Sequence, residues 1–256
     1  MARIFITGSS QGLGLAAGRL LVEQGHAVTL HARDASRADA TRRTLPAAEA
    51  VLTGDVSTLA AMRGLADQAN ARGRFDAVIH NVAIGYREKR RVETVDGLSQ
   101  LWAVNVLAPY VLTALMHRSD RLVFVSSELH RRAHAGLDDV QWTRRHWNGT
   151  QAYSETKLHD ALLALAVARR WPDVRSNAIE PGWVATRMGG PGATGDLSQG
   201  HVTQAWLAAG DEHATAISGR YFFHQRPARL HGDATWADLQ DGLIDLCESV
   251  SGVPFP

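Results

Sequence analysis

The chain has 256 residues, 45% of them hydrophobic, which fits one sizeable α/β domain with its own core. Its 27 basic and 26 acidic residues give a net charge of +1, so no overall field would draw it to nucleic acid or an anionic membrane. The only cysteine, Cys247, allows no internal disulfide and is expected to be a buried, unreactive thiol. A small, roughly neutral partner is therefore expected.

Short apolar runs alternate with segments of helical period along the chain. The runs predicted as buried strands are Arg3–Thr7, Ala27–Ala32, Glu49–Thr53, Phe75–His80, Arg121–Ser126 and Val174–Ile179, with a last strand near Ile217–Phe223 and a helix near Ala234–Ser249. This alternation predicts an α/β fold, a doubly wound parallel sheet of about seven strands flanked by helices. No repeat or linker divides residues 1–256, so a single domain is expected.

The N-terminal apolar run Ile4–Ile6 is too short for a signal-peptide core. The most apolar later stretch, Ala161–Ala168, is far shorter than the roughly 20 residues that a membrane span requires. A cytoplasmic protein without a membrane span is therefore expected.

The turn after the first predicted strand is rich in glycine. It reads Thr7-Gly8-Ser9-Ser10-Gln11-Gly12-Leu13-Gly14 and directly precedes the predicted helix Leu15–Gln24. Glycines let the backbone approach phosphates, and the N–H groups and positive dipole end of a helix bind negative charge. We therefore expect a dinucleotide pyrophosphate at this turn, although glycine triplets also form plain tight turns.

After the second predicted strand, the chain continues with Arg33 where an NAD-selective site places a carboxylate on the ribose 2′-hydroxyl. A guanidinium there can form a bidentate pair with a 2′-phosphate, which favours NADP(H) over NAD(H). Two alternatives stay open. Arg33 is a solvated residue at a strand end, or the adjacent Asp34 binds the ribose of NAD.

Tyr153 and Lys157 stand four residues apart at the start of a long helical pattern, which puts both side chains on one helix face. A nearby ammonium favours the phenolate, so such a tyrosine can exchange a proton with a carbonyl or alcohol oxygen. Ser127 ends a predicted strand at the sheet edge where ligands bind. It is expected to hydrogen-bond the reacting oxygen, unless it only forms a turn.

Taken together, these motifs resemble the classical short-chain dehydrogenase/reductases over nearly the whole chain. The glycine turn matches that family's Thr-Gly-x3-Gly-x-Gly motif. Asn105, Ser127, Tyr153 and Lys157 match its catalytic tetrad. The resemblance implies a Rossmann-type domain in which Ser127 orients the substrate oxygen and Tyr153 exchanges the proton. It also implies that Lys157 holds the ribose and lowers the pKa of the tyrosine, and that Asn105 holds a water of the proton relay.

The resemblance further implies the cofactor contacts. Asp55-Val56 resembles the pair that meets the adenine, and the turn from Pro181 to Thr186 resembles the one at the nicotinamide end. The expected cofactor-binding residues are Gly8, Ser9, Ser10, Gln11, Gly12, Leu13, Gly14, Arg33, Asp55, Val56, Asn81, Ala83, Tyr153, Lys157, Pro181, Gly182, Val184 and Thr186.

Some of these assignments keep an alternative. The alternative for Asp55 is an ordinary turn or helix-cap residue. The alternative for Asn105 is a polar residue that kinks a helix and bonds to backbone groups. The family usually reads Asn-Asn-Ala-Gly after the fourth strand, where this chain reads His80-Asn81-Val82-Ala83. A slight backbone shift is expected there.

The segment 128–150, between Ser127 and Tyr153, is about twice the family's usual length and resembles the retinol-dehydrogenase-like and protochlorophyllide-reductase-like branch. Members of that branch often act on large apolar carbonyl compounds. Trp142 and Trp147 therefore form an aromatic flap over a bulky substrate, or they anchor a long surface loop.

The segment 183–210 is also expected on the substrate side. Its glycine-rich part, Gly189–Gly195, precedes the helical stretch Gln199–Ala209 and is typical of a mobile lid. Trp183 and Trp206 are further candidates for the pocket lining.

His130, His134 and His146 suggest a metal site by their spacing, but no carboxylate or cysteine accompanies them at a ligand spacing. Hydride chemistry needs no metal, so none is expected.

The expected activity is NADPH-dependent reduction of a ketone or aldehyde, or the reverse oxidation of an alcohol, on a bulky apolar small molecule. A non-catalytic NADP(H)-binding regulator and a non-redox epimerase or dehydratase relative are the alternatives. Family members often pair through the helices after Leu98 and after Tyr153, which leaves open a homodimer, a homotetramer or, because of the insertion, a monomer.

Overall fold

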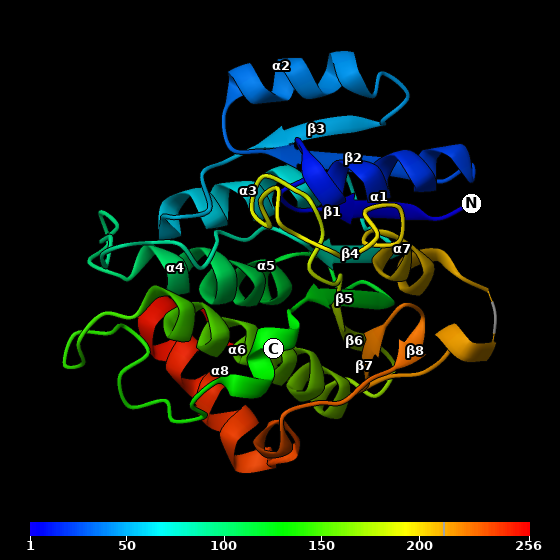
Figure 1. Cartoon of the computed structure of the whole chain (residues 1–256). Coiled ribbons are helices and arrows are strands. Elements are labelled where there is room, and N and C mark those ends of the chain that lie inside the picture. The colour runs from blue at the N-terminus through cyan, green and yellow to red at the C-terminus, as the bar shows by residue number, and fades with distance from the viewer. Residues whose placement is uncertain (212) are drawn as a thin grey trace.

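The computed structural model describes residues 1–211 and 213–256 and contains a central sheet with helices on both faces (Figure 1). Its strand order is β3-β2-β1-β4-β5-β6-β7-β8, and only β7 and β8 pair antiparallel. The strands are β1 (Arg3–Ile6), β2 (Ala27–Ala32), β3 (Ala50–Thr53), β4 (Ala77–His80), β5 (Arg121–Val125), β6 (Arg175–Glu180), β7 (Tyr221–Phe223) and β8 (Arg226–Pro227). The predicted doubly wound parallel sheet is confirmed, with a short eighth strand added.

The helices form two layers. They are α1 (Gly12–Glu23), α2 (Ala35–Thr44), α3 (Leu59–Ala71), α4 (Gln100–Trp102), α5 (Ala108–Leu115), α6 (Gly149–Arg170), α7 (Val202–Ala209) and α8 (Ala237–Ser251). A π-helical segment, η1 (Ala103–Leu107), joins α4 to α5, and the 3-10 segments are η2 (Glu128–Arg132), η3 (His213–Thr215) and η4 (Gly232–Thr235). None of the described helices is long and apolar enough to cross a membrane.

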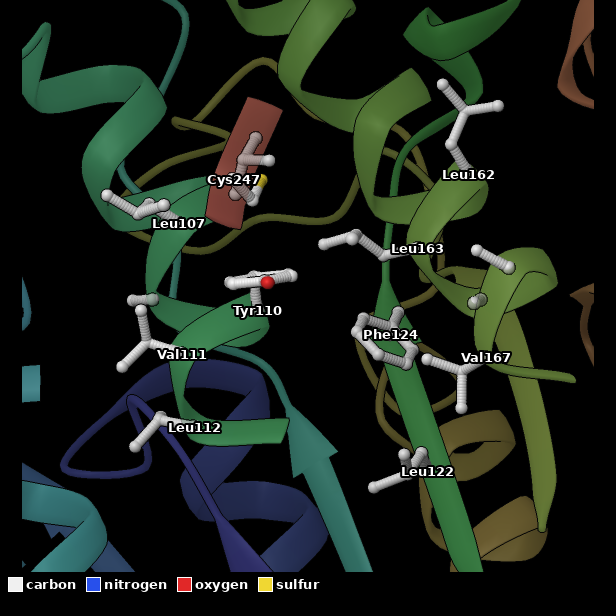
Figure 2. Close-up of a cluster of buried hydrophobic side chains, with 14 of the residues drawn as sticks. Leu107, Tyr110, Val111, Leu112, Leu122, Phe124, Leu162, Leu163, Val167 and Cys247 are labelled. Carbon is white, nitrogen blue, oxygen red and sulfur yellow. The ribbon is translucent and has the colours of Figure 1, made fainter. Parts of the chain in front are cut away.

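Each face of the sheet packs on its own apolar cluster. One cluster lies under α1, α2 and α7, and the larger one lies under α3, α5, α6 and α8. In Figure 2, Phe124 of β5 lies beside Leu163 and Val167 of α6, with Tyr110 of α5 and Cys247 of α8 in the same cluster. Cys247 is a free, fully buried thiol, as expected.

The sheet topology creates the place for a ligand. β1 has β2 on one side and β4 on the other, so the chain leaves β1 and β4 in opposite directions around the sheet. The loops that follow these strands and β5 and β6 meet along the carboxyl edge of the sheet. The residues predicted for cofactor and substrate lie along this edge.

Candidate active site

The glycine turn leads from β1 directly into α1 and leaves open space above it. Gly8 and Gly12 have φ values of 61° and 59°, in the left-handed region that glycine adopts easily. A Cβ at Gly12 would meet no protein atom within 4 Å. The first N–H groups of α1 have no acceptor within the helix, so they can bind an anion in this space. The residues present therefore fit a pyrophosphate.

His31 of β2 holds this turn, although no sequence motif selected this histidine. Its Nδ1 accepts from the Gly8 N–H at 3.0 Å, so its Nε2 must carry the proton that is donated to the Gly54 carbonyl at 2.9 Å. Burial lowers the pKa of His31, which favours this neutral form. The Ser9 hydroxyl and N–H are also used internally, by Ile6 and His31. The free N–H groups therefore begin at Ser10.

Asn81 clamps the turn from the end of β4. Its side-chain N–H groups donate to the carbonyls of Thr7 and Gly8 at 3.1 and 3.0 Å. A Cβ on Gly14 would lie 2.4 Å from the Asn81 side chain, and one on Gly8 would lie 2.6 Å from the backbone of Val82. Val82, which stands where the family's motif has alanine, thus packs directly on Gly8. Ala83 follows on the same edge of the sheet.

Tyr153 and Lys157 lie on the inner face of α6, and Ser127 faces them from the end of β5. Tyr153 is 6% exposed, its hydroxyl contacts the Met188 Sδ at 3.9 Å, and the Ser127 side chain is near enough to act on the pKa of the phenol. The Lys157 Nζ lies 5.6 Å from the centre of the Tyr153 ring. Burial raises the pKa of Tyr153, and the Lys157 ammonium partly counters that rise. The phenol is therefore protonated at neutral pH.

Lys157 is itself fixed by two buried partners. Its ammonium donates to the Val125 carbonyl at 2.9 Å and to the Asp160 carboxylate at 2.8 Å. Burial alone would lower the pKa of Lys157, but Asp160 holds that pKa above its ordinary value. One of the three ammonium protons remains for a further acceptor. Asp160 was missed from the sequence, although its i,i+3 spacing from Lys157 was a usable signal.

Asn105 joins the loop after β4 to α6. Its side-chain oxygen accepts from the Ile84 N–H at 2.9 Å, and its amide donates to the Ile84 carbonyl and to the Thr156 hydroxyl. It sits in the π-helical segment η1 and is fully buried. Asn105 thus lies in a distorted helix and is bonded largely to backbone groups, as the alternative interpretation stated. It also occupies the position that matches the asparagine of the family's catalytic tetrad.

The predicted adenosine-side residues lie at the ends of β2 and β3. Asp55 is exposed, and its carboxylate accepts from the Ser57 N–H, while Val56 is buried. The Arg33 side chain is 59% exposed, and its only ion pair among the described residues is with Asp34, at 3.9 Å. Asp34 caps α2 by accepting from the Arg37 N–H at 2.9 Å. Its carboxylate is thus already engaged.

The turn after β6 closes over the tyrosine. Gly182 has a φ of 79°, and its missing side chain makes room for Phe223. Val184 is buried, and the Thr186 hydroxyl accepts from the Gly189 N–H at 3.1 Å. Pro181 lines a neighbouring cavity. The mobility expected of 189–195 stays a prediction.

The insertion 128–150 is tied to the protein by its tryptophans. The Trp142 indole donates to the buried Glu155 of α6 at 3.1 Å, and the Trp147 indole donates to the Glu88 carbonyl at 2.8 Å. Arg145 lies over the Trp142 ring and pairs with Glu155 and Asp139. These contacts support the anchoring interpretation over the aromatic flap.

A cavity of about 390 Å³ lies between the turn after β6 and the β7–β8 hairpin. Trp183 lines it, as proposed from the sequence. Trp206 does not; it packs edge-on against Phe222 on the other face of the sheet. α7 contacts α1, and its tryptophan packs in the cluster on that face of the sheet, so the lining role of Trp206 stays a prediction.

The three histidines do not converge. His130 is buried, with Nδ1 at 2.7 Å from the Ser127 carbonyl and Nε2 accepting from the His231 N–H. His134 accepts from the Gly136 N–H. Within residues 1–211 and 213–256, no group of three or more His, Cys, Asp or Glu side chains is placed to hold a metal ion.

Comparison with known proteins agrees with this geometry. Residues 2–195 match the family model described as short chain dehydrogenase. The chain is 44% identical to an uncharacterized oxidoreductase of Emericella nidulans, covering 100% of this chain and 99% of the relative. It is 30% identical to a Streptomyces protein provisionally named as the daunorubicin C-13 ketoreductase DnrU, covering 97% and 92%. It is 27% identical to human retinol dehydrogenase 14, covering 98% and 86%, so the expected likeness to retinol dehydrogenases is confirmed.

Solved structures show the same fold. An uncharacterized protein of Mycobacterium paratuberculosis superposes with a TM-score of 0.87 at 26% identity, covering 100% of this chain and 95% of the other. A blue fluorescent protein from a metagenomic library, solved in complex with NADPH, superposes with a TM-score of 0.69 at 22% identity, covering 86% and 95%.

Proposed function

Since the chain belongs to the short-chain dehydrogenase/reductase family and is thus an oxidoreductase, we propose that it uses NADPH to reduce a bulky ketone or aldehyde. The observation that carries this proposal is the buried, protonated hydroxyl of Tyr153, which lies beside Ser127 and near the Lys157 ammonium. A protonated phenol is poised to donate, which favours reduction over alcohol oxidation. The unpaired Cys247 supports a cytoplasmic location.

The nicotinamide cofactor, when bound, supplies the hydride. The chain's part is to hold the pyrophosphate on the N–H groups from Ser10 to Gly14 and to direct the remaining ammonium proton of Lys157 to the ribose. Ser127 positions the carbonyl oxygen, and Tyr153 donates the proton to it as charge develops there. Met188 contacts the tyrosine hydroxyl, and Tyr153 is buried.

Arg33 supports the choice of NADP(H) over NAD(H). Its guanidinium is exposed, and its ion pair with Asp34 is long, so it is available to a 2′-phosphate. Asp34 caps α2 and pairs with Arg37, which makes it a poor acceptor for the ribose 2′-hydroxyl of NAD.

The cofactor assignment is tested by titration with NADPH and NADH, followed by nicotinamide fluorescence. Arg33→Ala is expected to weaken NADPH binding about tenfold or more, as loss of a charge-assisted bond does, and to leave NADH binding unchanged. Arg43→Ala, an exposed arginine at the far end of α2, is the matched control. An unchanged NADPH affinity in Arg33→Ala would show that the 2′-phosphate assignment is wrong.

The catalytic assignment is tested with a panel of bulky ketones, quinones and aldehydes. Tyr153→Phe is expected to abolish NADPH oxidation and to retain NADPH affinity within about twofold, because the ring stays in place. Tyr86→Phe, whose ring lies 5.7 Å from that of Tyr153, is the control and should retain turnover. Turnover in Tyr153→Phe would refute the proton-donor role, and cofactor binding without any turnover would favour the regulator.

A further inference from the structure

A cavity lies beside the turn after β6, next to the catalytic residues in the chain. It has a volume of about 390 Å³, and Glu128, which lines it, directly follows Ser127 in the chain. Pro181 and Gly182, which the family resemblance places at the nicotinamide end of the cofactor, also line it, so it adjoins the place where the reacting carbonyl would lie. Its size suits a ring system. Whatever part of a substrate projects from the carbonyl would enter this space.

The walls of the cavity include two exposed aromatic side chains. Trp183 is 47% exposed and Phe223 is 38% exposed, although large aromatic residues are usually buried. Their faces offer a flat organic group a place to stack and attract a cation through the ring quadrupole.

The charges of the lining are unbalanced. Three carboxylates, Glu128, Glu180 and Asp196, face one guanidinium, that of Arg131. Arg131 is already paired with Glu128 at 3.1 Å and with Glu180 at 3.3 Å. An anionic group would therefore meet an excess of negative charge and no unpaired lysine or arginine among the described lining residues.

Glu180 supplies the strongest point of attraction. Its side chain is only 6% exposed, and Arg131 contacts only its Oε1. Its Oε2 has no hydrogen-bond partner within the part of the chain that the structure describes, so a donor from a ligand would satisfy it. Burial raises the pKa of Glu180, and Arg131 partly counters that rise.

The β7–β8 hairpin is held in a costly conformation at the same cavity. His224 and Gln225 form its two-residue loop with φ values of 47° and 61°, where glycine or asparagine is usual. A residue other than glycine adopts this region at a cost in backbone strain. His224 lines the cavity, and its ring packs edge-on against Phe223. Strain of this kind persists where it positions groups for a function.

We propose that this cavity selects carbonyl substrates that carry a primary ammonium group on an aromatic or other flat ring system. The ring lies against Trp183 and Phe223, and the ammonium donates to Glu180 and Glu128. This inference rests on the proposed function, because it concerns the substrate of the same site. It replaces a purely apolar substrate with an amphipathic, cationic one.

The binding test uses three probes with one skeleton and different charge: 2-naphthylmethylamine, 2-naphthylmethanol and 2-naphthoate. In calorimetric titration of the protein saturated with NADPH at neutral pH, the amine is expected to bind about tenfold tighter than the alcohol, and the naphthoate weakest. Glu128→Gln combined with Glu180→Gln should reduce the ratio of amine to alcohol affinity to about one. Glu23→Gln, an exposed carboxylate on α1, should leave it unchanged.

The outcomes separate the two proposals. Equal affinity for amine and alcohol, or a ratio that survives the double substitution, overturns the ammonium subsite even if the protein reduces neutral ketones. Glu128→Gln alone, at a side chain that is 56% exposed, guards against a folding defect and should reduce the ratio in part. The binding test needs no turnover. If the protein prefers the amine but reduces none of the ketone panel, the ammonium subsite stands and only the proposed reductase activity is refuted.

Discussion

Asp160 changes the electrostatics of the reacting tyrosine from one helical turn beyond Lys157. Burial raises the pKa of Asp160 to about 6, and the Lys157 ammonium counters that rise, so the carboxylate is ionised at neutral pH. It offsets part of the positive field that Lys157 exerts on the phenol, and it contributes to the raised pKa of Tyr153. The pair thus positions Lys157 while keeping Tyr153 a proton donor.

Asp160→Asn is expected to lower the pKa of Tyr153, because the ammonium then acts on the phenol without a counter-charge. Carbonyl reduction needs the protonated phenol, so the alkaline limb of kcat/KM should move to lower pH by about one unit. The measurement is a pH–rate profile of ketone reduction, with circular dichroism to confirm folding. An unmoved limb in a folded variant would limit Asp160 to a structural role.

At the scale of elements, short local patterns predicted most of the site. The strands, the glycine turn and the Tyr153–Lys157 pair each depend on a few neighbouring residues, and the structure places them along one edge of the sheet. The insertion 128–150 could not be predicted in the same way. Its conformation depends on long-range contacts, such as Trp147 with the Glu88 carbonyl, that leave no periodic signal in the sequence. The paired two-residue strand β8 is equally invisible.

The insertion should stabilise α6 through Arg145. The Arg145 guanidinium neutralises two buried carboxylates, Asp139 and Glu155, and Glu155 lies two residues after Tyr153. Arg145→Met is expected to cost about 3 kcal/mol of unfolding free energy, because both carboxylates stay buried without their partner. The neighbouring Arg144→Met removes only an exposed pair with Asp138 and should cost less than about 1 kcal/mol. Urea unfolding measures both, and equal effects would contradict the anchoring role.

At the scale of the whole molecule, four buried histidines make stability depend on pH. Burial lowers the pKa of His80 and His159 to about 3 and that of His130 to about 4, and it also lowers the pKa of His31. In the unfolded chain these groups titrate near ~6.5. Above that pH these histidines are neutral in both the folded and the unfolded protein, so their protonation does not change the free energy of unfolding. As pH falls below it, the unfolded chain takes up protons that the folded protein cannot, so stability falls.

His159→Leu should weaken this acid sensitivity. Within the described chain, neither ring nitrogen of His159 has a hydrogen-bond partner. Leucine removes a buried polar group without breaking a bond, so it is expected to stabilise the protein by about 1 kcal/mol at neutral pH. It should also reduce the loss of unfolding free energy below about pH 6 by about 1.4 kcal/mol per pH unit. Urea unfolding at neutral and acidic pH measures both effects, and an unchanged slope would show that His159 titrates normally.

The same packing predicts that the protein is a monomer. Residues 101–113, which include most of α5, and residues 152–167 of α6 are all buried within a single chain. α8 packs along α6, Arg170 pairs with Asp241, and the Tyr110 hydroxyl donates to the Val253 carbonyl. In Figure 2, Cys247 of α8 lies in the same cluster as Leu107 and Leu162. The C-terminal segment thus covers the helices through which relatives of this family often pair.

A helix that is buried all round has no face left for a second subunit. Light scattering during gel filtration is therefore expected to give a mass near 27.8 kDa that does not rise with protein concentration. A stable dimer buries about 800 Å² on each partner, so a dimeric mass would require another surface of this size. Leu243→Glu, which places a charge in the fully buried face of α8, should loosen this cover and lower the melting temperature. A rise in mass in that variant alone would show that α8 occupies the place of a partner.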